Sequence, residues 1–248
     1  MKDFLKLQLR LWSILGIIIL TPSCSDVEFE THPVNGTSTG IFNPNKNYGT
    51  LIDQDGNIYK TITIGTQTWM AENLRTTIYR NGNPIPEVIS RSDWETTNSE
   101  AYCNPNNTAN VDSITTFGRL YNWFTISSSK NIAPKGWHVS TLDDWTTLAN
   151  YIGNDAANKM KEIGFTHWVF PNTYATNETG FTALPGINRL YNGIFSLTYA
   201  NKNAYWWTST DLDNQVAIII CIFDNLSTLS TGGAANIHHG FYVRCVKD

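Results

Sequence analysis

The sequence predicts an α+β fold with a mainly antiparallel, twisted sheet, two short helices and long loops. Strand patterns occur before and after the middle of the chain, and turn residues rather than crossover helices join consecutive strands. Two helical patterns follow each other between residues 140 and 164. Because strands and helices are segregated along the chain, the pattern favours α+β over an alternating α/β fold.

The first residues have the features of an export signal. Lys2, Lys6 and Arg10 precede an apolar run over residues 11–20, and small residues follow up to Cys24. The run is shorter than the roughly twenty residues that a membrane-spanning helix needs. A cysteine in this place resembles a bacterial lipobox. We therefore predict a lipoprotein signal peptide over residues 1–23 and lipidation of Cys24; an ordinary signal peptide with an incidental cysteine is the alternative.

The segment after this cysteine predicts a flexible tether over residues 24–47. Asp26, Glu28 and Glu30 make its beginning acidic, which resembles the surface-export signal of Bacteroidetes lipoproteins; a solvated charge run is the alternative. Residues 31–47 are mainly His, Pro, Asn, Gly, Ser and Thr, a composition that is typical of linkers and poor in core-forming side chains. We expect the folded domain to span residues 48–248.

The charge balance argues against one class of partner. The chain has 17 Lys and Arg against 21 Asp and Glu, a net charge of −4, and loss of the signal peptide removes three basic residues and one acidic residue. The exported chain is therefore more acidic still. A nucleic-acid-binding surface needs a basic stripe, so no nucleic acid is expected as a partner.

The first strands are predicted as a hairpin between residues 50 and 64. Asp55-Gly56 is a turn signal, and Ile58, Ile62 and Ile64 share one parity of the following strand. Residues 53–57 also have the look of a calcium loop, but an EF-hand needs Glu at the twelfth position, which is Ile64 here. The turn interpretation is favoured.

The two helices are predicted next. Ser140 and Thr141 precede Asp143 and Asp144 at capping-box spacing, and apolar residues then recur with helical period up to a glycine stop: Trp145, Leu148, Ala149, Ile152, Gly153. Trp145 is therefore predicted to be a core anchor. A second, shorter helix follows a cap at Asn154 or Asp155 and has one apolar face before the next glycine: Ala156, Met160, Ile163, Gly164.

Two strands are predicted near the carboxyl end. The apolar run over residues 216–223 is typical of a central strand that is covered on both faces. In the last strand, Phe241, Val243 and Cys245 alternate with their neighbours. Trp206 and Trp207 are adjacent on another strand, so we expect one of them to face the core and the other to face outward.

Aromatic and glycine landmarks carry a family resemblance. They are Tyr-Asn-Trp at 121–123, Pro-Lys-Gly-Trp-His at 134–138, Gly-Phe-Thr-Ala-Leu-Pro-Gly at 180–186, Ala-Tyr-Trp-Trp-Thr-Ser-Thr at 204–210 and Gly-Phe-Tyr-Val-Arg-Cys-Val at 240–246. This set resembles the Fibrobacter succinogenes major paralogous domain of surface lipoproteins, which is similar to the C-type-lectin fold. The same carboxyl-terminal pattern resembles lectin-like variable proteins that retroelements diversify.

The resemblance implies an arrangement of strands and a ligand surface. It covers nearly all of residues 50–248 and implies that the segment at Trp137 is the first lectin-like strand, beside the closing strand at 240–246. It places the ligand surface between about residues 185 and 239. It also implies a cysteine at position 133 opposite Cys245, but Ala133 stands there. Cys103, Cys221 and Cys245 leave three single-bridge pairings open, and buried free thiols are as good an alternative.

No enzymatic site or cofactor is predicted. The lectin-like fold is also similar to that of formylglycine-generating enzymes, whose chemistry uses two nearby cysteines, whereas Cys245 has no companion within the preceding twenty residues. His238 and His239 are neighbours on an extended segment and point apart, which disfavours a shared metal. Calcium is left open, because several oxygen-bearing residues lie near one loop region: Asp211, Asp213, Asn214, Asp224, Asn225.

Aromatic and amide side chains remain as candidates for binding. Five lie between the Pro-Gly turn and the Trp-Trp strand: Tyr191, Asn192, Tyr199, Asn201, Tyr205. Rigid rings beside adaptable hydrogen-bonding groups are typical of recognition surfaces, although inward packing and turn formation are alternatives. The sequence thus predicts a surface-exposed outer-membrane lipoprotein that binds a protein or glycan ligand without catalysis. A structural or adhesive envelope component, and a formylglycine-generating-enzyme-like or hydrolase module, are the other classes.

Overall fold

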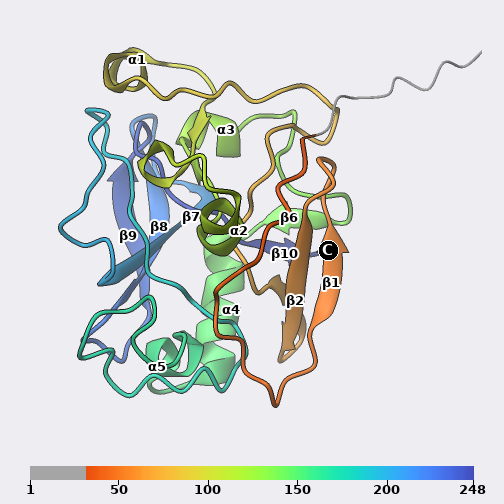
Figure 1. Ribbon diagram of the computed structural model, residues 1–248, viewed down its shortest axis with the longest axis vertical. Coiled ribbons are helices and arrows are strands. Elements are labelled where there is room, and N and C mark those ends of the chain that lie inside the picture. The colour runs from red at the N-terminus through yellow and green to blue at the C-terminus, as the bar shows by residue number, and fades with distance from the viewer. Residues whose placement is uncertain (1–31) are drawn as a thin grey trace, which may run out of the picture. The chain divides into compact units, whose positions relative to one another are not determined.

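A computed structural model describes residues 32–248 (Figure 1). The predicted signal peptide, the lipidation site at Cys24 and the acidic cluster lie outside the described residues. Within the described part of the chain, no helix combines the length and the hydrophobicity that a membrane crossing needs.

The larger sheet has five strands in the order β1-β2-β3-β10-β6, and all of its pairings are antiparallel. The last strand of the chain lies in its interior, where Val246 pairs with Trp69 on one side and with His138 on the other. The expected pairing of the closing strand with the segment at Trp137 is therefore present. The strands are β1 (Gly49–Ile52), β2 (Ile58–Ile64), β3 (Gln67–Met70), β6 (Trp137–Val139) and β10 (Cys245–Lys247).

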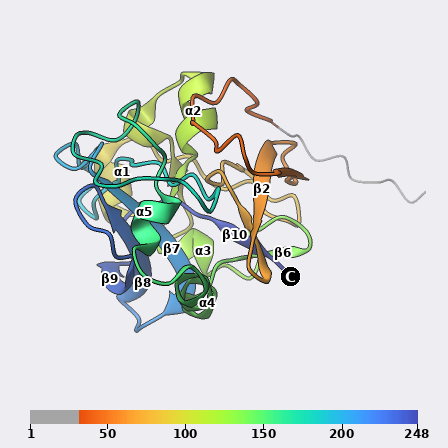
Figure 2. The same cartoon turned by 90° about the horizontal axis from the view of Figure 1, so that it is seen from below.

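A second antiparallel sheet is built from β7 (Asn203–Asp211), β8 (Val216–Phe223) and β9 (Ser230–Asn236). The central strand β8 is buried along residues 217–222, as its apolar run predicts. Figure 1 shows this sheet, in blue, across from the orange strands β1 and β2, with α4 running between the two, and Figure 2 shows the same arrangement from below. A two-stranded ribbon joins β4 (Tyr102–Cys103) to β5 (Leu120–Tyr121).

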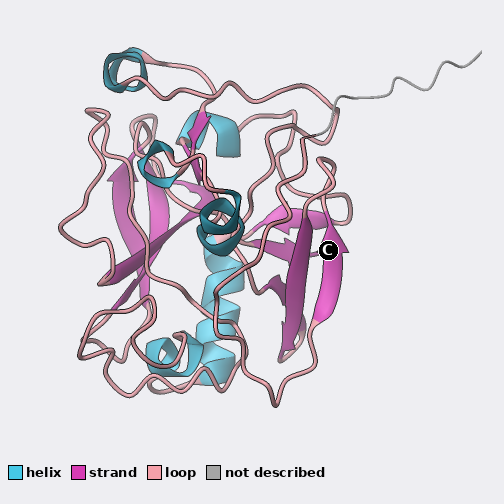
Figure 3. Cartoon of the chain, viewed as in Figure 1, coloured by secondary structure: helices cyan, strands magenta, loops and turns pink. Residues whose placement is uncertain are grey.

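The two predicted helices are present. In α4 (Leu142–Ile152), Thr141 and Asp144 form the capping box and Trp145 is fully buried. The second helix, α5 (Ala156–Met160), follows Asp155 and ends before Ile163, which lies on the surface. Four further short helices were not predicted: α1 (Arg91–Thr96), η1 (Pro105–Asn107), α2 (Val111–Phe117) and α3 (Trp123–Ile126). Long loops connect these elements, as Figure 3 shows, so the α+β prediction is confirmed.

The predicted hairpin is also present, and residues on both faces of β2 are buried. Tyr59 and Thr61 are buried near its start, whereas Ile62 and Ile64 are buried near its end and Ile58 is exposed. Tyr59 and Ile62 belong to different hydrophobic clusters. Each face of β2 is thus covered over only half of the strand, which a single alternation does not predict.

The prediction that Trp206 or Trp207 faces outward is wrong, because both are fully buried. Adjacent strand residues do point to opposite faces. Here each face packs on its own cluster: Trp206 donates through Nε1 to Asn73 Oδ1 at 2.9 Å, and Trp207 donates to the Tyr121 carbonyl at 2.8 Å. The strand therefore joins two cores.

The described part of the predicted tether, residues 32–47, differs from the prediction because it lies along the domain. Its backbone N–H groups donate to side chains of the body: His32 to Asp55 at 2.8 Å, Val34 to Asn57 at 2.7 Å and Ile41 to Glu162 at 2.6 Å, among others. A composition poor in large apolar residues forms no core, but it still supplies backbone donors for buried acceptors. We call residues 32–42 the strap.

Candidate functional site

The structure separates the five predicted binding residues into three places. Tyr199 and Tyr205 line one hollow, and Asn201 lines a different pocket. Tyr191 and Asn192 lie in a turn near α1, where the Asn192 carbonyl accepts a hydrogen bond from Arg91 Nε at 3.2 Å. The side chain of Asn192 accepts from the Ile194 N–H and so stabilises that turn.

The Tyr199–Tyr205 hollow has a volume of about 560 Å³ and is lined by Tyr199, Lys202, Asn203, Tyr205, Phe223, Asp224 and Asn225. Its floor follows from the register of the second sheet, in which Asn203 pairs with Phe223 and Tyr205 pairs with Cys221. Directly opposed residues of antiparallel strands share a face, as do residues two apart on one strand. The β7–β8 pairing therefore brings Tyr205 and Phe223 to one side of the sheet.

The rings of the hollow are available to a partner to different degrees. Tyr199 is 50% exposed and comes from a turn that closes when the Lys202 N–H donates to the Tyr199 carbonyl at 3.0 Å. Tyr205 and Phe223 are half-buried. One exposed ring, that of Tyr199, therefore lies beside two rings that the fold holds in place. A surface that is already ordered in this way loses less conformational entropy on binding.

Polar groups around these rings are oriented by the fold. Asn203 Nδ2 donates to the Tyr205 hydroxyl at 2.6 Å. Burial raises the pKa of Tyr205, against the effect of that hydrogen bond, so its O–H remains a donor for a ligand. Behind the rim, Lys161 Nζ donates to the Asp224 carbonyl at 3.0 Å. Burial lowers the pKa of Lys161 to about 8, although the Asp224 carboxylate opposes the shift.

A row of rings connects two of the predicted places. Tyr205 lies 5.5 Å from Phe241, Phe241 lies 5.5 Å from His239, and His239 lies 5.7 Å from Tyr191, measured between ring centroids. Burial, with a smaller contribution from His238, lowers the pKa of His239 to about 4, so its ring is neutral at physiological pH. Tyr191 is 55% exposed and ends the row at the surface.

Sequence reasoning missed the far wall of the hollow. The sequence marks Phe223 only as the end of a strand and Asp224 and Asn225 as oxygen donors for calcium, and it does not single out Lys202. The register between β7 and β8 carries this information, and no local motif encodes it.

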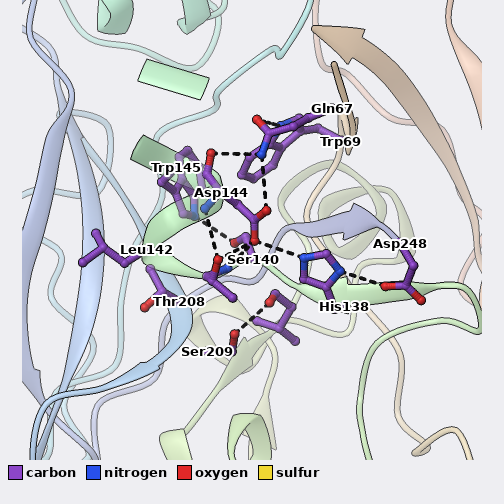
Figure 4. Close-up of polar contacts among 12 residues, drawn as sticks. Gln67, Trp69, His138, Ser140, Leu142, Asp144, Trp145, Thr208, Ser209 and Asp248 are labelled. Atoms are coloured by element: carbon purple, nitrogen blue, oxygen red, sulfur yellow. Dashed lines mark hydrogen bonds and ion pairs between the residues drawn. The ribbon is translucent and has the colours of Figure 1, made fainter. Parts of the chain in front are cut away.

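His138 forms the most connected charged cluster of the described residues (Figure 4). Its Nε2 lies 3.0 Å from Asp144 Oδ2, and its Nδ1 lies 2.8 Å from Asp248 Oδ1. Burial lowers the pKa of His138, but the hydrogen bonds with Asp248 and Asp144 outweigh burial, so the pKa is raised overall. Since a carboxylate occupies each ring nitrogen, the cluster ties β6, the start of α4 and residue 248 together and leaves no nitrogen free as a base.

The cysteines are free and buried. Within residues 32–248, Cys103, Cys221 and Cys245 form no disulfide. Burial raises the pKa of Cys103 and of Cys221 to about 12, and it raises that of Cys245 as well. The nucleophilic form of cysteine is the thiolate. Because their pKa values are raised, these thiols stay protonated at neutral pH and are poor nucleophiles. In the described part of the chain, no group of three or more His, Cys, Asp or Glu residues is placed to hold a metal ion.

Residues of the aromatic and glycine motifs lie in the interior of the domain. Arg244 is 1% exposed and lies 4.4 Å from the centroid of the Phe181 ring.

The family model of the Fibrobacter succinogenes major domain matches residues 62–247. The chain belongs to the Fibrobacter succinogenes major domain family. No curated protein and no solved structure matches it, so the C-type-lectin-like part of the fold prediction stays a prediction.

In this member of the Fibrobacter succinogenes major domain family, buried arginines organise the loops. Arg189 donates to the carbonyl groups of Val88, Ile89 and Ser90, and Arg75 donates to the carbonyl of Val34 in the strap. Planar guanidinium groups with several donors suit this bridging of backbone segments. These arginines are therefore scaffold residues.

Proposed function

We propose that this protein is a non-catalytic recognition module of the cell envelope that binds a protein or glycan ligand through the Tyr199–Tyr205 hollow. One observation carries the proposal: a half-exposed tyrosine stands beside two anchored rings in a hollow that also holds an amine, a carboxyl group and amides. Aromatic side chains among adaptable polar groups contribute much of the binding energy at recognition surfaces.

The chemistry of the remaining residues supports binding over catalysis. The three thiols are buried with raised pKa values, and both nitrogens of His138 are engaged by carboxylates. A covalent mechanism needs an activated nucleophile, and acid–base catalysis needs a group free to exchange a proton. Neither condition is met at the histidine cluster or at the cysteines.

The envelope location rests on the amino-terminal sequence. A basic start, a short apolar run and Cys24 fit a lipoprotein signal, and lipid chains on Cys24 would hold the module at the outer membrane. The strap then leads directly onto the domain. Surface exposure at the outer membrane is part of the proposal, because a recognition module there meets ligands outside the cell.

The test compares two exposed tyrosines. The 248-residue chain and its Tyr199→Ala and Tyr151→Ala variants are applied to a glycan array and to pull-downs with purified envelope proteins. Tyr151 is 67% exposed on α4, away from the hollow, and serves as the matched control. We expect Tyr199→Ala to weaken binding about tenfold or more, as for a central aromatic contact.

Each outcome has a defined meaning. Equal binding by the Tyr199→Ala variant would remove the hollow from the proposal. A chain that binds nothing alone but assembles with other envelope proteins would favour a structural or adhesive component. Turnover of a substrate that is lost on mutation of an acidic residue would favour an enzyme.

A further inference from the structure

A second site lies next to the turn that carries Tyr199, at Ala200 and Asn201. This pocket of about 290 Å³ is separate from the Tyr199–Tyr205 hollow. It is lined by Pro105, Asn106, Thr108, Ser113, Phe117, Gly186, Ile187, Ala200, Asn201 and Tyr242, and we call it the Tyr242 pocket. The pocket joins residues 105–117, which include η1 and α2, to residues 186–187, residues 200–201 and Tyr242.

Tyr242 presents an unusual polar group to this pocket. Its side chain is 2% exposed, and within the described residues its buried hydroxyl has no hydrogen-bond partner. Buried tyrosine hydroxyls are nearly always bonded to a protein group, a water or a ligand, because an unpaired one costs about 1–3 kcal/mol. The hydroxyl thus has the chemistry of a contact that a bound molecule completes.

Gly186 packs against the end of this tyrosine. A Cβ atom at position 186 would lie 2.5 Å from Cε2 of Tyr242 and 2.6 Å from its hydroxyl oxygen. Real Cβ atoms do not approach other atoms so closely. Any other residue would therefore displace the ring, and glycine at the end of the Ala-Leu-Pro-Gly landmark preserves the wall of the pocket.

The lining defines the class of ligand. Apolar surface comes from Phe117, Ile187 and Ala200, whereas Asn106 and Asn201 supply amide groups. The hydroxyl groups of Thr108 and Ser113 and the phenol of Tyr242 complete the polar set, and no charged side chain lines the pocket. Its volume of about 290 Å³ lies just below the range of about 300–1,000 Å³ that is usual for small-molecule sites, so only a small ligand fits. A ligand of one ring, uncharged, with apolar and hydroxylated faces, fits this description.

We propose that the Tyr242 pocket binds a neutral pyranose, with one sugar hydroxyl hydrogen-bonded to Tyr242 and another to the amide of Asn201. The inference does not depend on the Tyr199–Tyr205 hollow, because the two sites share no lining residue. It assigns a chemical class to a second site of the same module.

Saturation-transfer-difference NMR tests the proposal with the 248-residue chain, purified in a detergent that has no sugar headgroup. The probes are the methyl glycosides of glucose, galactose, mannose, xylose and N-acetylglucosamine, with glucuronic acid as the charged comparison. We expect at least one neutral glycoside to bind and the charged sugar to bind more weakly. Failure of every neutral glycoside at tens of millimolar would overturn the proposal.

Three variants locate the binding. Tyr242→Phe removes only the hydroxyl and is expected to weaken binding about tenfold, and Asn201→Ala about threefold, as for the loss of single hydrogen bonds. Tyr79→Phe makes the same change at a buried tyrosine that does not line the pocket, and it should bind as the wild type does. Unchanged affinity in the Tyr242→Phe variant would overturn the assignment of the site.

Thermal unfolding separates the proposal from a structural role of the hydroxyl. Because removal of an unpaired buried hydroxyl relieves a cost, Tyr242→Phe should keep or raise the unfolding midpoint without ligand. A lowered midpoint together with absent sugar binding would assign the hydroxyl to a buried structural water and refute the ligand site.

Discussion

Replacement of Arg244 by Met should lower the stability of the domain more than any surface change. The guanidinium group donates from Nε to Asn73 Oδ1 at 2.8 Å and from Nη1 to the carbonyl groups of Met70 and Phe181 at 2.9 and 2.8 Å. A further bond from Nη2 reaches the Thr182 carbonyl at 3.1 Å. The side chain thereby joins β3, the loop at 180–186 and the closing segment.

The magnitude follows from two opposing effects. Each hydrogen bond to a charged group contributes about 1.5–3 kcal/mol, and four are lost in Arg244→Met. Burial of the charge itself costs several kcal/mol, which the variant recovers. The same burial lowers the pKa of Arg244 to about 9, while Glu72 opposes the shift. We expect a net loss of about 3–5 kcal/mol in the free energy of unfolding.

Urea denaturation and thermal unfolding measure this loss. For a domain of this size, 1 kcal/mol shifts the midpoint by about 2–4 °C, so the expected decrease is about 6–20 °C. Arg91→Met is the matched control, because Arg91 is exposed and makes one long bond to the Asn192 carbonyl. That variant should change stability by less than about 0.5 kcal/mol. A decrease of less than about 1 kcal/mol in the free energy of unfolding of Arg244→Met would refute the conclusion that the hydrogen bonds of this arginine stabilise the domain.

Two further predictions concern charge and anchoring. The raised pKa of His138 means that its stabilising effect is complete below about pH 6.5 and is lost as pH rises through the folded-state pKa. Because the side chain is 38% exposed, the contribution is at most about 1 kcal/mol, and His138→Gln should flatten the stability profile between pH 5.5 and 8.5; an unchanged profile would contradict this. Cys24→Ser should move the protein from the membrane to the soluble fraction while the domain unfolds at the same temperature, and continued membrane association would rule out the lipid anchor.

The parts of the fold that were predictable carry local signals. Thr141 and Asp144 mark the start of α4 through a capping box, and the apolar run of β8 needs no partner to be recognised as a buried strand. By contrast, α2 is rich in Thr, Val and Ile, which have modest helix propensity. It is fixed by the Asn110 cap and by the strap, which bonds to Thr115 and Thr116.

The site was predictable only on one side. Tyr199 and Tyr205 stood out as rings among amides, but Phe223 reaches them through the pairing of β7 with β8, about twenty residues further along the chain. Tyr242 was visible only as a residue of the last strand. Its role depends on the close approach of Gly186, which is a tertiary contact that periodicity does not report.

The turn at residues 199–202 contributes to both the Tyr199–Tyr205 hollow and the Tyr242 pocket. Backbone hydrogen bonds fix its position in the domain. The Asn201 carbonyl accepts from the Val169 N–H at 2.9 Å, and the Lys202 carbonyl accepts from the Asp224 N–H at 2.7 Å. Next to the turn, the Asn203 carbonyl accepts from the Gly186 N–H at 2.9 Å. None of these bonds uses the side chain of Tyr199 or Asn201, so both side chains are changeable without loss of the turn. A rigid backbone under exchangeable side chains lowers the ordering cost of binding, and it lets substitutions on this turn report on recognition rather than on folding.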